Sequence, residues 1–78
     1  MSDLFLLRWT ELFEIPERPL YIELGCGKGG FISQIAPAKP EINFIAMDIK
    51  NEMLVLAKRK IENAYESADM PLNNVKIA

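Results

Sequence analysis

The chain has 78 residues, half of them hydrophobic, and a formal net charge of −2. This length allows one small domain at most, and the hydrophobic content is typical of a folded protein rather than a disordered one. The charge gives no electrostatic footprint for nucleic acid in this segment, although a basic RNA-binding surface on another part of a longer protein is compatible with it.

The chain contains one cysteine, Cys26, and no histidine. This excludes an internal disulfide, a zinc-type cluster and the Cys–His and Ser–His catalytic pairs, so no metal site is expected. Because Cys26 lies between two glycines, we interpret it as a packing residue rather than a nucleophile. The N-terminus lacks the basic leader and long apolar core of a signal peptide, and no segment has the length of a transmembrane helix. A reducing cytoplasm is therefore the expected location, without a membrane partner.

Residues 1–19 are predicted to form a first helix and a short linker. Ser2 or Asp3 is a suitable N-cap for this helix. Its apolar residues recur at helical spacing and define one face, formed by Phe5, Trp9, Leu12 and Phe13. The two prolines in residues 15–19 then end the helix and favour an extended connector.

A strand followed by a glycine-rich turn begins at Leu20. The apolar run Leu20–Leu24 is rich in strand-forming residues, and four glycines follow within residues 25–30. In α/β proteins, a strand that leads through such a turn into a helix binds a nucleotide cofactor. We expect Gly25 to permit the sharp turn and Gly27 to let the backbone approach the ligand. Gly29 or Gly30 is expected to let the helix pack closely against the strand.

The glycine spacing alone fits both a dinucleotide loop and an S-adenosylmethionine loop, and Glu23 favours the second. Glu23 lies two residues before the first glycine, near the carboxyl end of the strand, where ligands bind in open α/β sheets. A carboxylate there would repel a dinucleotide pyrophosphate seated on the helix N-terminus. S-adenosylmethionine instead carries an ammonium and a sulfonium group that suit Glu23. The alternative is that Glu23 simply points into solvent.

The next two elements are a short helix and a second strand. The helix is predicted from about Gly29 to Ala36, where Pro37 ends it, with a buried stripe of Phe31, Ile32 and Ile35. The strand is predicted over 41–48. Its residues 44–47 are continuously apolar, as in a parallel strand that is covered on both faces.

A third helix and a third strand complete the chain. The helix is predicted from Asn51 to about Glu66, and its apolar stripe consists of Leu54, Ala57, Ile61 and Ala64. The basic run 58–60 lies mostly off this stripe and is interpreted as a solvated face. Residues 74–78 alternate weakly and indicate a strand cut off near its start. The order βαβαβ corresponds to half of a doubly wound parallel sheet with right-handed crossovers.

Asp48 supplies a second candidate cofactor contact, at the carboxyl end of the second strand. A right-handed βαβ unit brings this position beside the glycine turn, where the carboxylate can accept two hydrogen bonds from a ribose diol. An alternative, compatible role is to cap the third helix. Lys28 opposes the dipole of its helix, so either an anionic ligand group or plain exposure accounts for it.

These segments resemble the class I methyltransferases that methylate N7 of guanine in tRNA. Residues 20–29 are similar to the first motif of that family, with its Glu-x-Gly-x-Gly-Lys-Gly pattern, and 40–48 and 74–76 are similar to its second and third strands. Trp9 and the pair at 12–13 match the residues that precede the first strand. The resemblance implies an α/β fold, a Rossmann-like class I methyltransferase half-domain with S-adenosylmethionine as cofactor.

The resemblance also implies what the chain lacks. The Pro-Asp-Pro-Trp segment of the family, the acidic residue associated with guanine and much of the tRNA surface lie beyond this sequence, and Pro37 replaces an unbroken helix end. We therefore expect a single partial domain over 1–78, truncated at the C-terminus, with no catalytic residue and no turnover of its own. In the intact protein, tRNA would be the partner. The predicted cofactor-binding residues are Glu23, Gly25, Cys26, Gly27, Lys28, Asp48 and Ile49.

Three alternatives remain open from the sequence. One is a class I methyltransferase acting on another substrate, and a second is a nicotinamide-dinucleotide-binding module, which fits Asp48 but not Glu23. The third is a fragment without ligand affinity, because half a sheet leaves its first strand unpaired on one side. Such an edge also predicts self-association.

Overall fold

The computed structural model describes residues 11–78, and this part of the chain forms three strands and two helices. In chain order these are β1 (Leu20–Leu24), α2 (Gly30–Ile35), β2 (Asn43–Met47), α3 (Asn51–Ser67) and β3 (Val75–Ile77). The predicted order from the first strand onward is confirmed, with boundaries that differ by at most two residues. The predicted first helix begins within residues 1–10 and lies outside the described residues.

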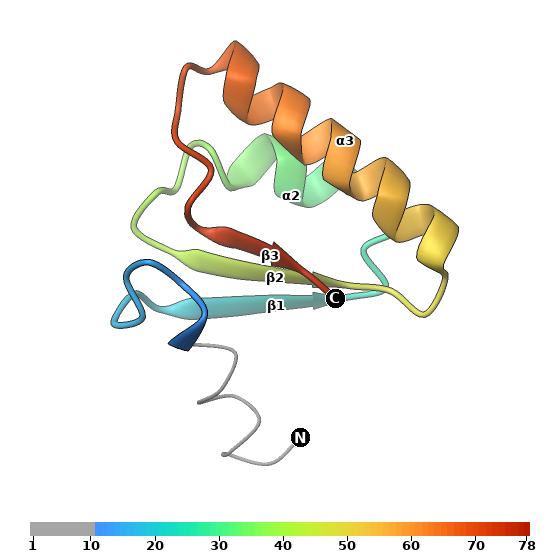
Figure 1. Ribbon diagram of the computed structural model, residues 1–78, viewed down its shortest axis with the longest axis horizontal. Helices are drawn as coiled ribbons and strands as arrows, with labels where there is room; N and C mark the ends of the chain where they lie inside the picture. The colour runs from blue at the N-terminus through green and yellow to red at the C-terminus, as the bar shows by residue number, and fades with distance from the viewer. Residues whose placement is uncertain (1–10) are drawn as a thin grey trace.

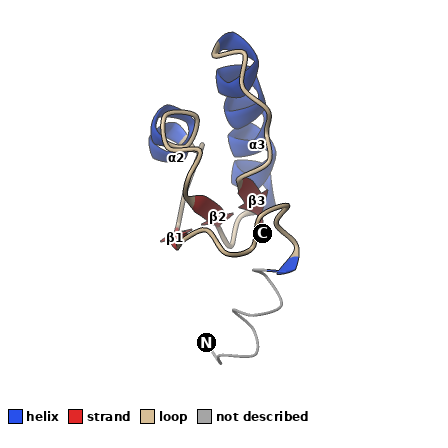
Figure 2. Ribbon diagram, turned by 90° about the vertical axis from the view of Figure 1, so that its left-hand side faces the viewer, coloured by secondary structure: helices blue, strands red, loops and turns tan. Residues whose placement is uncertain are grey.

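The three strands form one parallel sheet in the order β1-β2-β3. Ile22 pairs with Ile45 of β2, and Ile45 pairs with Lys76 of β3. Both helices lie on the same face of the sheet, α2 near β1 and α3 above β3 (Figures 1 and 2). The α/β class and the parallel sheet predicted from the sequence are therefore confirmed.

The hydrophobic core lies between the sheet and the two helices. Alternate residues of β2, Phe44 and Ala46, face this core, and Ile45 between them is also fully buried. Figure 2 shows the segment that precedes β1 on the side of the sheet away from the helices, and Phe13 in this segment is buried. The prediction that β2 is covered on both faces is confirmed. The buried cluster consists of Cys26, Ile32, Ala36, Phe44, Ala46, Ala57, Ile61 and Tyr65.

Helix α2 is shorter than average, and one residue of its predicted stripe is not buried. Ile32 has no exposed surface, but Phe31 is 49% exposed and its ring centroid lies 6.1 Å from that of Tyr21. The prediction of a buried Phe31 was wrong because this position turns toward β1, an outer strand, where Tyr21 is itself 43% exposed. Ser33 is buried instead, and its hydroxyl donates to the Gly30 carbonyl at 3.1 Å.

A buried asparagine fastens the loop between α2 and β2. The side-chain amide of Asn74 donates to the carbonyl oxygens of Ala36, Lys39 and Ile42 at 3.3, 3.2 and 2.9 Å. Its carbonyl oxygen accepts a hydrogen bond from the hydroxyl of Tyr65 on α3. Burial raises the pKa of Tyr65 to about 12, so this hydroxyl stays protonated as a donor. One side chain thus joins both helices, the loop and the start of β3.

Candidate functional site

The predicted site residues meet at the carboxyl edge of the sheet. Because β1 and β2 are parallel, the turn after β1 and the residues after β2 emerge at the same edge. The Cys26 N–H in this turn donates to the Met47 carbonyl at the end of β2, at 2.9 Å. The glycine turn is therefore attached directly to the neighbouring strand.

Three glycines of the turn adopt a left-handed backbone. Their φ values are 71° at Gly25, 56° at Gly27 and 77° at Gly29, a region that residues with a Cβ rarely adopt. A Cβ added at Gly25 or Gly27 would meet no atom within 4 Å, so the space above both residues is open to a ligand. The left-handed backbone at Gly25 is the kind that the predicted sharp turn requires, and the ligand contact at Gly27 stays a prediction.

The close packing predicted for the later glycines has a different partner. A Cβ at Gly29 would lie 3.0 Å from the Cα and the Cβ of Ala57 on α3, whereas one at Gly30 would meet nothing. The expected helix–strand contact was therefore wrong: the glycine admits the approach of a second helix. The sequence signal was present in Ala57, one of the two alanines on the predicted stripe of α3.

Asp48 binds the turn through its side chain. Its Oδ2 accepts a hydrogen bond from the Gly27 N–H, and its Oδ1 accepts one from the Lys50 N–H, both at 2.9 Å. These two backbone donors hold the pKa of the Asp48 carboxyl below its ordinary value, and the Lys50 N–H makes the larger contribution. Lys50 is the N-cap of α3. Asp48 therefore does not itself cap α3, as the alternative role required, but orders the residues that lead into it.

Glu23 contributes a second carboxylate on the helix-facing side of β1. Its partner in the sheet register is Ala46, which belongs to the core. Its Oε2 is buried and has no hydrogen-bond partner among the described residues, and this desolvation raises the pKa of Glu23. A buried carboxylate oxygen without a donor is costly, so it marks a place that a cationic or hydrogen-bonding ligand would stabilise.

A hollow of about 550 Å³ opens at this edge. Three of the predicted residues line it, namely Gly25, Asp48 and Ile49, whose side chain is 97% exposed. The sequence analysis missed the remaining lining residues, although each of them stands at or just beyond a strand end. These are Leu24, Met47 and Ala78.

Comparison with known proteins decides the family. A family model described as a putative methyltransferase matches residues 17–78, which include every strand and the whole candidate site. The chain belongs to this methyltransferase family.

Individual relatives within the methyltransferases agree with this assignment. The chain is 54% identical over 69 residues to the tRNA (guanine-N(7)-)-methyltransferase of Clostridium perfringens (strain 13), and the match covers 88% of the chain and 32% of that relative. It is 47% identical over 70 residues to the enzyme of the same name from Acetivibrio thermocellus, covering 90% and 32%. The resemblance predicted from the sequence is confirmed. The chain spans about a third of the length of these relatives.

The two remaining residues of the predicted site, Cys26 and Lys28, differ in their exposure to solvent. Cys26 is 6% exposed, and its thiol donates to the Gly27 carbonyl at 3.6 Å. Burial, followed by the charges of Asp48 and Glu23, raises the pKa of this thiol, so it stays protonated and serves as packing, as we interpreted it. Lys28 is exposed and does not line the hollow.

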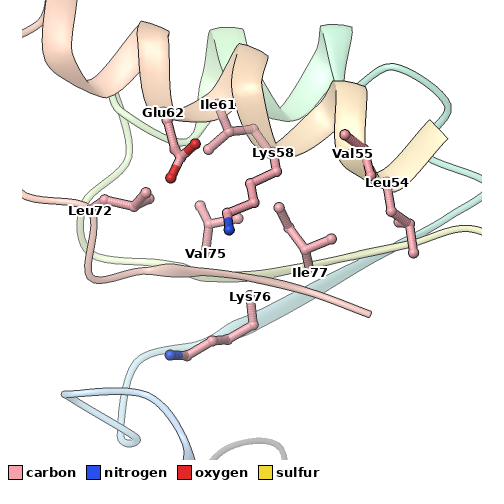
Figure 3. Close-up of a pocket in the computed structure, with 9 residues that line it drawn as sticks. All are labelled: Leu54, Val55, Lys58, Ile61, Glu62, Leu72, Val75, Lys76 and Ile77. Carbon is pink, nitrogen blue, oxygen red and sulfur yellow. The ribbon is translucent and has the colours of Figure 1, made fainter. Parts of the chain in front are cut away.

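A second hollow lies between α3 and β3, and none of the predicted site residues lines it (Figure 3). Its walls are mostly apolar, with Lys58 and Glu62 of α3 over the opening and Lys76 pointing away from that helix. Residues 11–78 contain no group of three or more His, Cys, Asp or Glu side chains able to hold a metal ion. Within the same range, no helix is long and apolar enough to cross a membrane.

Proposed function

We propose that the intact protein is an S-adenosylmethionine-dependent methyltransferase that forms N7-methylguanine in tRNA, and that this chain is its cofactor-binding half. The observation that carries the proposal is the pairing of two carboxylates, Glu23 and Asp48, around an open turn of left-handed glycines. The relatives that share about half of their aligned residues with the chain supply the reaction and the substrate.

The residues present suit the cofactor. Asp48 retains acceptor capacity beyond its two backbone bonds, enough to take hydrogen bonds from a ribose diol beside Gly27. The unpartnered oxygen of Glu23 suits an ammonium or sulfonium group. The apolar walls of the hollow, Leu24 and Met47, suit an adenine ring. When bound, S-adenosylmethionine supplies an electrophilic methyl group on sulfur.

The chain contributes to catalysis by orientation. Guanine N7 carries a free lone pair when N9 is substituted, so no strong base is needed to make it nucleophilic. Holding the two reactants in line supplies much of the rate in such a displacement. Because the chain spans about a third of the length of its methyltransferase relatives, we propose that it binds the cofactor and does not turn over on its own.

The dinucleotide alternative is disfavoured by the same geometry. The pyrophosphate of NAD would approach the turn beside the buried oxygen of Glu23, where a second negative group would be repelled. Asp48 would repel the 2′-phosphate of NADP in the same way. A methyltransferase acting on another substrate has the same cofactor half and is distinguished only by the second experiment below.

The cofactor assignment is tested by titrating the ¹⁵N-labelled chain with S-adenosylhomocysteine and, separately, with NAD. We expect S-adenosylhomocysteine to shift the amides of residues 23–30 and 48–50 selectively. Asp48→Ala and Glu23→Gln should each weaken this binding. Glu41→Gln, which removes an exposed carboxylate before β2, is the matched control and should bind as the wild type does. Selective binding of NAD, or no binding by a chain with a dispersed spectrum, would overturn the assignment.

The substrate assignment is tested with a chimera. Residues of the Clostridium perfringens relative that align with this chain are replaced by the chain itself, and tRNA is assayed for N7-methylguanine by nucleoside mass spectrometry. We expect the chimera to methylate tRNA, and Asp48→Ala within it to abolish the product. A chimera that binds S-adenosylhomocysteine but leaves tRNA unmodified would favour the reading with another substrate.

Two further properties are proposed with this function. A tRNA substrate favours the cytoplasm as the location.

The outer edge of β1, which pairs only with β2 among the described strands, is proposed as a site of self-association.

A further inference from the structure

The glycine turn touches helix α3 at one point. Gly29 lies so close to Ala57 that an added Cβ would come within 3.0 Å of the Cα and the Cβ of Ala57 and within 3.4 Å of its carbonyl oxygen. Contacts at 3.0 Å are shorter than ordinary van der Waals distances, so a side chain at position 29 does not fit. Ala57 itself has no exposed surface, so a larger side chain there would have to displace a packed neighbour.

The same residue is connected by hydrogen bonds to both ends of the turn. Its N–H donates to the Cys26 carbonyl at 3.0 Å, and its carbonyl accepts from the Ser33 N–H at 2.9 Å in the first turn of α2. Gly27 lies only two residues earlier and donates to Asp48 Oδ2 at 2.9 Å. A displacement of Gly29 is therefore transmitted along a short, tightly bonded segment to the Gly27–Asp48 bond.

We infer that Ala57 is a positioning residue for the cofactor site: its small side chain sets how deeply the glycine turn seats against α3, and thereby whether Gly27 reaches Asp48. Ala57 is fully buried and lies about two helical turns along α3 from Lys50, the N-cap residue whose N–H donates to Asp48. The consequence for ligand binding rests on the proposed function, whereas the effect on the Gly27–Asp48 bond does not.

A larger side chain at Ala57 should move the turn rather than the helix. Helix α3 is held by the buried side chains of Ile61 and Tyr65, and Tyr65 is hydrogen-bonded to Asn74. The turn, in contrast, has an open side, because Gly25 and Gly27 face empty space. Displacement of the turn into that space lengthens the Gly27–Asp48 bond and narrows the place where a ligand would lie.

The test compares Ala57→Val with Ala64→Gly. Valine adds two γ carbons at the residue that contacts Gly29, whereas a glycine at position 64 destabilises the same helix and leaves that contact residue unchanged. The first measurement, which needs no ligand, follows the Asp48 carboxyl by ¹³C NMR as pH is lowered, together with hydrogen exchange at the Gly27 amide. The other titratable groups near this carboxyl are Lys50, Cys26 and Glu23.

We expect Ala57→Val to raise the pKa of Asp48 and to speed exchange at Gly27, because one backbone donor is lost. Ala64→Gly should leave both values as in the wild type, even though its stability falls. A loss of stability alone changes the unfolded population and not the pKa of the folded one, so a merely structural role of Ala57 predicts no difference between the variants. If Ala57→Val does not fold, Ala57→Ser, which adds a single oxygen, replaces it with the same expectation.

The second measurement is the affinity for S-adenosylhomocysteine, which we expect Ala57→Val to weaken about 10-fold or more and Ala64→Gly to preserve. A wild-type pKa at Asp48 in a folded Ala57→Val or Ala57→Ser chain would overturn the inference. If the wild type itself does not bind S-adenosylhomocysteine, the proposed function fails, and the Asp48 titration still decides the role of Ala57.

Discussion

Asp48 connects the glycine turn with the start of α3, two segments that lie apart in the sequence. One oxygen of its carboxylate holds the glycine turn, and the other holds the residue that begins α3. The spacing between Gly25 and Asp48 predicted that the two would lie together, because parallel strands end at a common edge. It did not predict the bond to Gly27, which depends on the local path of a turn with three left-handed glycines.

This bonding makes the contribution of Asp48 to stability dependent on pH. The folded pKa lies below the ordinary value of 3.8, so the charged carboxylate stabilises the fold above that value and loses this contribution as the pH falls through the folded pKa. We expect the difference in unfolding free energy between the wild type and Asp48→Asn to narrow as the pH drops below 3.8.

Urea unfolding at a series of pH values measures this difference. The comparison with Glu41→Gln provides the control, because Glu41 is exposed and its replacement should give no such narrowing. If the difference in unfolding free energy between Asp48→Asn and the wild type stayed constant from neutral to acid pH, the charged Asp48 carboxylate would not have the stabilising role described above.

At the scale of elements, the strands and helices were predictable because their apolar periods are clear, while several side-chain environments were not. The spacing of Ala57 and Ile61 identified the buried face of α3, but Tyr65 on the same face was not predicted as core. Phe31 followed the helical period and is nevertheless half exposed. Periodicity gives the direction of a side chain, and only the tertiary arrangement decides whether another element covers it.

The hydrogen bonds of Asn74 could not be predicted from the sequence either. Its three carbonyl partners are backbone groups of one loop, and backbone groups leave no signal in the residue types. We expect Asn74→Ala to lower the unfolding free energy by about 1–3 kcal/mol, since it removes the donor to three loop carbonyls and the acceptor of the Tyr65 hydroxyl. Tyr65→Phe should cost less, because it removes a single bond.

Urea denaturation of these variants is compared with that of Asn63→Ala, which removes an exposed amide from α3 and should lie within about 0.5 kcal/mol of the wild type. Equal stabilities for Asn74→Ala and Asn63→Ala would show that the loop does not depend on this side chain.

At the scale of the whole molecule, the two outer strands of the described sheet differ in character. β3 has three residues with a lysine at the centre, which is typical of a protected edge. β1 has five residues, no lysine or proline, and an exposed Leu24 at 71%. Its composition is that of an interior strand, which is why we propose self-association at β1 and not at β3.

We expect the sedimentation coefficient of the wild type to rise with concentration and that of Leu24→Lys to remain constant, because a lysine on the edge disfavours strand addition. Leu72→Lys, at a residue 44% exposed near β3, should behave as the wild type does. A wild type that sediments as a monomer across the concentration series would contradict the proposed self-association.

The sheet order β1-β2-β3 repeats the order of synthesis. Each strand therefore pairs with the one that left the ribosome before it, and each connecting helix is complete before the next strand arrives. In this part of the sheet each strand pairs with the next one in the sequence, so no pairing joins segments that are far apart along the chain. A nascent chain is thus able to build the edge of the sheet that carries the candidate site as soon as Asp48 and α3 have emerged, while synthesis continues at several residues per second.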